Sequence, residues 1–125
     1  MSRIVFLNGS FLPIEDAKVP FMDRGFLFAD GIYEVAAVLD GRLIDNEAHL
    51  ARLDRSLGEI RIANPYSAAE WTKLEEELVR RNNLKEGLVY MEVTRGAAER
   101  DFGFPPANTP PTLSLIHISE PTRPY

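Results

Sequence analysis

Two dipeptides in the first 45 residues constrain the fold more than any other feature of the sequence. Asn8-Gly9 and Asp40-Gly41 each lie between two apolar runs. Asn-Gly and Asp-Gly favour the two-residue turn of a β-hairpin, because both central residues of that turn take positive φ. The chain therefore begins with antiparallel strands, which we predict over residues 3–8, 11–14, 32–39 and 42–45.

The apolar pattern changes to helical spacing after residue 45. Leu50, Leu53 and Leu57 recur at intervals of three and four residues, which is typical of one face of an α-helix. Ser67 and Glu70 have the spacing of a capping box at the start of a second helix. The elements predicted after the hairpins are two helices and a strand, over residues 46–61, 67–82 and 88–95. The fold class is therefore α+β, an antiparallel sheet with two helices packed on it.

Composition excludes several classes of function. With 14 basic and 19 acidic residues the chain carries a formal net charge of −5, whereas nucleic-acid-binding domains are usually strongly basic. The sequence has no cysteine and two histidines, so it offers no disulfide and little to bind a metal. It contains no run of about 20 apolar residues, the length that crosses a membrane. We therefore expect a cytoplasmic protein of one domain that binds no nucleic acid, no membrane and no metal.

The last residues, 113–125, read LSLIHISEPTRPY and show neither strand nor helix period. This string resembles the translated adapter of a sequencing library. We therefore expect the natural domain to cover residues 1–112 and the tail to be foreign and disordered. The alternative is a natural disordered C-terminus.

Arg52 lies one helical turn after His49, on a face that the leucines do not occupy. A guanidinium in that position can bind a phosphate through two parallel hydrogen bonds. The alternative is an exposed arginine that pairs with Asp45 or Glu59.

Tyr33 and Arg100 are the other two candidates. Tyr33 interrupts an apolar strand, so its hydroxyl needs a partner if it is buried; the alternative is a core or edge tyrosine bonded to water or backbone. Arg100 lies in the loop after the last predicted strand, and loops on a rigid scaffold often carry function. The alternative is a local ion pair with Glu99 or Asp101, worth at most about 1 kcal/mol.

Five segments, in their order and at their spacing, resemble one family. They are residues 23–26 (DRGF), 28–35 (FADGIYEV), 46–53 (NEAHLARL), 93–96 (VTRG) and 100–105 (RDFGFP). Together they resemble the class IV aminotransferases, the fold-type IV enzymes that use pyridoxal phosphate, over residues 3–112. The D-amino-acid aminotransferases are the most similar branch. Branched-chain aminotransferases and aminodeoxychorismate lyases share the motifs at residues 23–35 and 46–53.

The resemblance implies the small N-terminal domain of that fold, and a homodimer that transfers an amino group from an amino acid to a 2-oxo acid. Arg52 matches the arginine that binds the phosphate of pyridoxal 5′-phosphate. Tyr33 and Arg100 match the residues that hold the substrate α-carboxylate, and Arg100 would reach into the partner subunit's site. Phe102 stands where the D-amino-acid branch often has a histidine, which removes one hydrogen-bond donor.

The Schiff-base lysine of the family has no counterpart among the three lysines of this chain, Lys18, Lys73 and Lys85. In the family that lysine lies downstream of the loop, in a second and larger domain. We therefore expect an N-terminal fragment with no catalytic residue of its own and no activity alone. The remaining alternative is a free-standing α+β binding module without catalysis.

Overall fold

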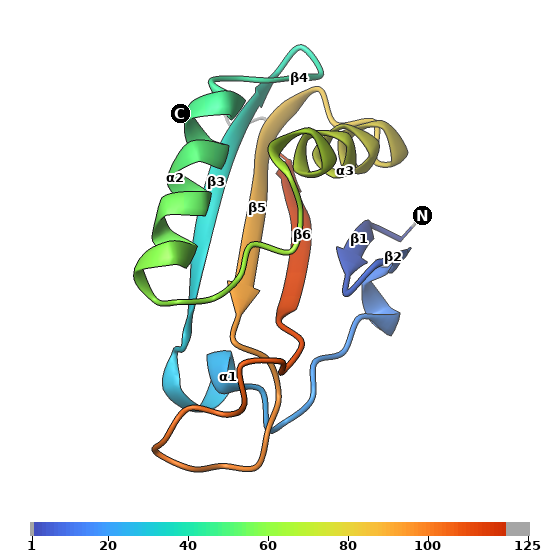
Figure 1. Ribbon diagram of the computed structural model, residues 1–125. Helices are drawn as coiled ribbons and strands as arrows, with labels where there is room; N and C mark the ends of the chain where they lie inside the picture. The colour runs from blue at the N-terminus through green and yellow to red at the C-terminus, as the bar shows by residue number, and fades with distance from the viewer. Residues whose placement is uncertain (1, 120–125) are drawn as a thin grey trace, which may run out of the picture.

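The computed structural model describes residues 2–119, which form one six-stranded sheet with two long helices (Figure 1). The elements in chain order are β1 (Ile4–Leu7), β2 (Ser10–Pro13), η1 (Ile14–Asp16), α1 (Arg24–Phe28), β3 (Gly31–Leu39), β4 (Arg42–Leu43), α2 (Asn46–Glu59), α3 (Ala68–Arg81), β5 (Glu86–Thr94) and β6 (Thr112–Ser119). The strands lie in the order β2-β1-β6-β5-β3-β4, and each neighbouring pair is antiparallel. The predicted α+β class is confirmed.

Both predicted hairpin turns are present. The φ angle is positive at Asn8 and Gly9 (47° and 98°) and at Asp40 and Gly41 (53° and 73°), as a turn between twisted strands requires. The first turn pairs β1 with β2, and the second pairs β3 with β4. Strand β4 is shorter than predicted, because Asp45 takes a left-handed conformation (φ 53°) immediately before α2.

Residues Arg24–Phe28 form the short helix α1, an element absent from those predicted from the sequence. The Asp23 carboxylate accepts a hydrogen bond from the backbone N–H of Gly25 at 2.8 Å, which caps the helix. A β-carbon at Gly25 would lie 2.3 Å from Thr94 Cγ2, so the close approach of α1 to β5 requires glycine. Five residues are too few for a helical period to show in a sequence.

The two long helices supply one side of the core. Helix α2 buries Leu50, Leu53 and Leu57, as their spacing predicted. Helix α3 begins with the predicted capping box: Glu70 N–H donates to Ser67 Oγ at 3.1 Å, and Ser67 N–H donates to Glu70 Oε1 at 2.9 Å. Helix α2 runs beside β3, and α3 crosses the sheet beside β6 and β1 (Figure 1). Among residues 2–119, no helix has both the length and the apolar character needed to cross a membrane.

The expectation of a disordered tail is wrong for residues 113–119. Thr112–Ser119 forms β6, which lies between β1 and β5, and Leu113 and Leu115 are buried in the core. The reason is positional: β1 and β5 both present backbone groups that need a strand between them, and alternating apolar residues can fill that place. The foreign origin of the tail stays a prediction, and residues 120–125 lie outside the described part.

The two faces of the sheet differ. Glu34, Met91 and Leu115 pair across β3, β5 and β6 on the side that the helices cover, and all three are buried. The residues next to them point to the other face. That open face carries Tyr33, Val35, Ala37, Leu39, Leu88, Tyr90, Ile116 and Ile118. Tyr33, Leu39 and Ile118 are 63%, 57% and 48% exposed, so within the described residues this apolar face has no cover.

Candidate functional site

Arg52 is held by a carboxylate from the neighbouring strand. Its Nε and Nη2 atoms donate to the two oxygens of Glu34 at 2.7 and 2.9 Å. His49, one turn earlier on α2, places Nδ1 3.1 Å from Glu34 Oε1. The partner of Arg52 is therefore Glu34, on β3, and not Asp45 or Glu59, which the sequence offered as alternatives.

The Glu34 carboxylate stays charged although its side chain is only 5% exposed. Burial raises the pKa of Glu34, but hydrogen bonds from Arg52 and His49 outweigh burial, so the pKa lies below its ordinary value. The same pair raises the pKa of Arg52. Sequence reasoning missed Glu34; the signal was one acidic residue on the inward side of an apolar strand, facing a helix with His49 and Arg52 at i and i+3.

The geometry leaves one edge of the Arg52 guanidinium available. The side chain is 57% exposed, and a guanidinium has five N–H donors. Glu34 takes one from Nε and one from Nη2. The edge between Nη1 and Nη2 still carries two parallel N–H groups, which is the fork that fits two oxygens of a phosphate.

Tyr33 lies on the open face, at the start of β3. Its ring stacks on Tyr90 with centroids 5.4 Å apart and an interplanar angle of 21°. The Tyr90 hydroxyl donates to Glu92 Oε1 at 2.9 Å; burial, that hydrogen bond and the nearby charge of Glu92 raise the pKa of Tyr90 to about 12. Both tyrosines and Glu92 line a hollow of about 300 Å³. Tyr33 is therefore neither a core residue nor a buried one.

Arg100 lies in the long loop between β5 and β6. Its guanidinium carbon is 5.0 Å from the ring centroid of Phe28 and 5.1 Å from that of Phe102. Of the ion pairs formed within residues 2–119, none joins Arg100 to Glu99 or Asp101. The exposed guanidinium is held by aromatic rings, not by the local ion pair that was the alternative.

The three predicted residues occupy three places in one chain. Tyr33 and Glu34 are adjacent in β3, so their side chains point to opposite faces of the sheet, and Arg52 follows Glu34 on the helical side. Among the interactions of the described residues, none joins Arg100 to Tyr33 or to Arg52. Lys18, Lys73 and Lys85 are all exposed and line neither the Tyr33 hollow nor the Arg52 pair.

The chain is similar in sequence to known proteins. A family model described as "Amino-transferase class IV" matches residues 31–125. A D-alanine aminotransferase of Staphylococcus aureus is 39% identical over 121 residues, 97% of this chain and 43% of the relative. One from Staphylococcus epidermidis is 43% identical over 112 residues, 90% of this chain and 39% of the relative.

Solved structures show the same fold. A branched-chain amino acid aminotransferase from Escherichia coli superposes with a TM-score of 0.86 at 21% identity, covering 96% of this chain and 42% of that one. A 4-amino-4-deoxychorismate lyase from Pseudomonas aeruginosa gives a TM-score of 0.72 at 29% identity, covering 96% and 41%. The chain thus spans about two fifths of the length of the proteins it matches.

Proposed function

Because the chain belongs to the class IV aminotransferases, we propose that it is the N-terminal part of an enzyme that transfers an amino group between a D-amino acid and a 2-oxo acid. The cofactor we propose is pyridoxal 5′-phosphate. The identity to D-alanine aminotransferases, 39% over 97% of this chain, supports the D-amino-acid branch. The cofactor, when bound, supplies an electron sink for the chemistry at the amino-acid α-carbon.

We assign the cofactor phosphate to Arg52, and the observation that carries the proposal is the geometry of its guanidinium. Glu34 fixes one edge of the group through two hydrogen bonds, so the other edge is preorganised for a dianion. The side chain is more than half exposed, which leaves room for a ligand. The Glu34 carboxylate is buried and the Nη1–Nη2 edge of Arg52 is exposed, so this edge can bind a phosphate without rearrangement of β3 or α2.

We assign the substrate α-carboxylate to Tyr33 and Arg100. Within one chain they do not meet, and Arg100 is exposed at the end of a loop. A second copy of the chain would bring its Arg100 to the Tyr33 hollow, so a homodimer completes the site. Phe102, 82% exposed, supplies no hydrogen bond to that carboxylate.

The phosphate assignment is tested by binding. We expect Arg52→Ala to weaken the binding of pyridoxal phosphate to the complete enzyme at least tenfold, because a charge-assisted hydrogen bond is worth about 1.5–3 kcal/mol. Arg55→Ala is the matched control, since Arg55 is an exposed arginine on the same helix. Equal affinities of the two variants, measured by equilibrium dialysis, would show Arg52 to be an ordinary surface residue.

The substrate assignment is tested by kinetics of the complete enzyme. Arg100→Ala should raise KM for D-amino acids far more than for amines without a carboxylate. This chain alone should transfer no amino group, because none of its three lysines lies beside Arg52 or Tyr33. An adduct formed on one of them with borohydride and pyridoxal phosphate, together with turnover of an amino acid, would refute that expectation.

A lyase or a branched-chain aminotransferase of the same family is the second candidate. The 29% identity to a 4-amino-4-deoxychorismate lyase keeps it open. A complete enzyme that turns over L-amino acids and not D-amino acids, or eliminates rather than transfers, would favour it.

A further inference from the structure

Arg24, the first residue of α1, is a buried arginine, with only 4% of its surface exposed. Its Nε donates to Asp30 Oδ2 at 2.8 Å, and Arg95 Nε donates to the same oxygen at 2.8 Å. Burial raises the pKa of Asp30, but the hydrogen bonds from Arg95 and Arg24 outweigh it and hold the pKa below its ordinary value. Two guanidinium groups thus share one ionised carboxylate.

The second edge of Arg24 contacts the loop that carries Arg100. Its Nη1 donates to the backbone carbonyls of Asp101 and Gly103, at 3.0 and 3.4 Å. These carbonyls flank Phe102, one and three residues after Arg100. Neither hydrogen bond depends on the side chains of the loop, so Arg24 acts on the path of the loop backbone.

The Phe28 ring lies between Arg24 and Arg100 and contacts both guanidinium groups. The Phe28 ring centroid lies 4.5 Å from the guanidinium carbon of Arg24 and 5.0 Å from that of Arg100. Arg95 adds a second link, because its guanidinium carbon is 4.4 Å from the ring centroid of Phe104. A cation over an aromatic ring at these distances is attractive.

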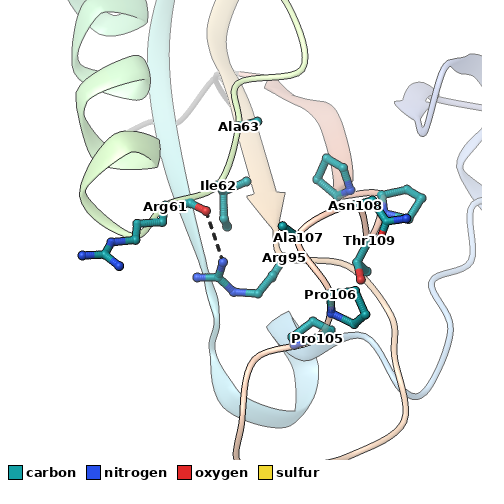
Figure 2. Close-up of a pocket in the computed structure, with 11 residues that line it drawn as sticks. Arg61, Ile62, Ala63, Arg95, Pro105, Pro106, Ala107, Asn108 and Thr109 are labelled. Carbon is teal, nitrogen blue, oxygen red and sulfur yellow. Dashed lines mark hydrogen bonds between the residues drawn. The ribbon is translucent and has the colours of Figure 1, made fainter.

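The frame behind this cluster is fixed by backbone hydrogen bonds. Arg24 N–H donates to Gly96 O at 2.8 Å, and Arg95 N–H donates to Asp30 O at 3.0 Å. Arg95 also donates to Ile60 O at 2.6 Å, at the end of α2. Figure 2 shows Arg95 extending from the end of β5 toward the backbone of Arg61. A hollow of about 240 Å³ lies beside it, and the proline-rich part of the loop, residues 105–111, lines its other side.

The loop itself has few other contacts. Phe102 and Phe104 are 82% and 73% exposed. The backbone hydrogen bonds of residues 97–111 include one that leaves the loop, from Ala98 N–H to Met22 O at 3.4 Å. They also include one within the loop, from Thr109 N–H to Pro106 O at 2.9 Å. Between these two bonds, the carbonyls of residues 101 and 103 are held by Arg24.

We propose that Arg24 is a positioning residue that fixes the loop carrying Arg100, through Asp30 on one side and the Asp101 and Gly103 carbonyls on the other. This inference rests on the proposed function only in giving Arg100 a substrate to bind. Arg24, 76 positions earlier in the chain, then places the loop backbone, and the rings of Phe28 and Phe102 hold the Arg100 guanidinium.

Hydrogen exchange of this chain tests the placement. In Arg24→Met, which keeps the length of the side chain and removes its donors, the hydrogen-bonded loop amides of Ala98 and Gly103 should exchange at least tenfold faster, while those of β5 stay within twofold. Glu99→Gln is the matched control: it changes an exposed side chain of the same loop and leaves the contacts of Arg24, so the loop should exchange less than threefold faster. A folded Arg24→Met chain with unchanged loop exchange overturns the proposal.

A spectroscopic signature separates positioning of Arg100 from general support of the fold. The Arg100 Nε–Hε resonance should be displaced by the Phe28 and Phe102 rings, and Arg24→Met should return it to its position in an unfolded chain. Arg24→Lys, which keeps the charge and one donor, should restore part of the displacement. An undisplaced resonance in the unmodified chain, or one that Arg24→Met does not move, contradicts the proposal.

If Arg24→Met fails to fold, Arg24→Lys tests the same contacts, because one ammonium group cannot replace the donors to both Asp30 and the loop carbonyls, and loop exchange must still rise. If neither variant folds, the Arg100 resonance of the unmodified chain decides. These measurements need neither cofactor nor substrate. A complete enzyme that binds no pyridoxal phosphate would therefore refute the proposed function and leave the role of Arg24 standing.

Discussion

The two arginines assigned to ligand binding are held in different ways. Arg52 sits on α2, whose inner side consists of buried leucines, and its guanidinium is fixed by one carboxylate. Arg100 sits in a loop with exposed side chains, and within residues 2–119 its guanidinium lies over two aromatic rings. The first is placed by a regular element that packs on the core, the second by a distant buried cluster.

This difference teaches where each site is vulnerable. Local stability increases with the apolar area that a segment buries and with the protection of its hydrogen bonds from solvent. Helix α2, which carries Arg52, therefore shares the stability of the core. The Arg100 loop is stabilised by a few polar contacts through Arg24. It can therefore open without unfolding the sheet.

The largest effect is expected in the packing beneath Arg52. Leu53 is completely buried, and Leu53→Ala should lower the free energy of unfolding by about 2–5 kcal/mol, because it removes buried methyl groups and leaves a cavity. Urea denaturation followed by circular dichroism measures it. Leu39→Ala, the same change on the open face, is the control; an equal loss in both would mean that the open face is covered in solution.

The pH dependence of stability is the next largest effect, and it also belongs to the helical layer. Glu75 of α3 is completely buried and accepts a hydrogen bond from Asn46 Nδ2 at 2.9 Å. Its Oε2 and the Asn46 Oδ1 are buried without a partner among the described residues, so a proton on Glu75 adds a donor to a site with two unpaired acceptors. Burial raises the pKa of Glu75 to about 7, despite the hydrogen bond from Asn46.

A raised pKa in the folded state means that stability is fullest below the ordinary pKa of a glutamic acid and falls as the pH rises through about 7. We expect a loss of as much as about 3 kcal/mol between pH 4.5 and 7.5, at about 1.4 kcal/mol per pKa unit. Glu75→Gln should flatten this part of the profile. A native profile that stays flat over the same range would show Glu75 to be ionised in the fold.

A smaller effect is expected at the Glu34–Arg52 pair. Glu34→Gln should cost about 1 kcal/mol at pH 7, because the buried partner loses its charge-assisted hydrogen bonds while Arg52 stays solvated. The pKa of Glu34 is lowered, so its contribution is present above the ordinary glutamate pKa and is lost as the pH falls. Denaturation curves of the variant and the native chain should therefore converge in acid. Glu99→Gln, at an exposed loop position, controls for loss of charge.

The smallest effect is expected in the loop. Phe102 is 82% exposed, and Phe102→Ala should change the free energy of unfolding by less than about 0.5 kcal/mol, as exposed substitutions usually do. Thermal unfolding measures it. A loss above 1 kcal/mol would mean that the loop is packed as firmly as α2, and the contrast between the two regions would fail.

Local sequence signals predicted the regular elements and part of the site. The Asn8-Gly9 and Asp40-Gly41 turns, the leucine spacing of α2 and the capping box of α3 depend on neighbours within a few residues, and the structure confirms them. The same spacing put His49 and Arg52 on one face. The resemblance to class IV aminotransferases followed from short motifs of the same kind.

Other features depend on residues far apart in the chain, so no local pattern predicted them. Residues 113–119 show no simple alternation of apolar and polar residues because β6 buries the polar His117 and places Ile116 and Ile118 on the open face. Glu34 became the partner of Arg52, and Arg24 the support of the Arg100 loop, only when β3, α2 and the loop packed together.

The sequence by itself determined where turns, caps and helical faces occur, because these depend on backbone preferences and on spacing along one element. The tertiary structure decided which charges meet. Arg24, Asp30 and Arg95 form one cluster because α1, the start of β3 and the end of β5 converge. In that buried setting a carboxylate must be paired and hydrogen-bonded to stay ionised, so packing assigned its partners.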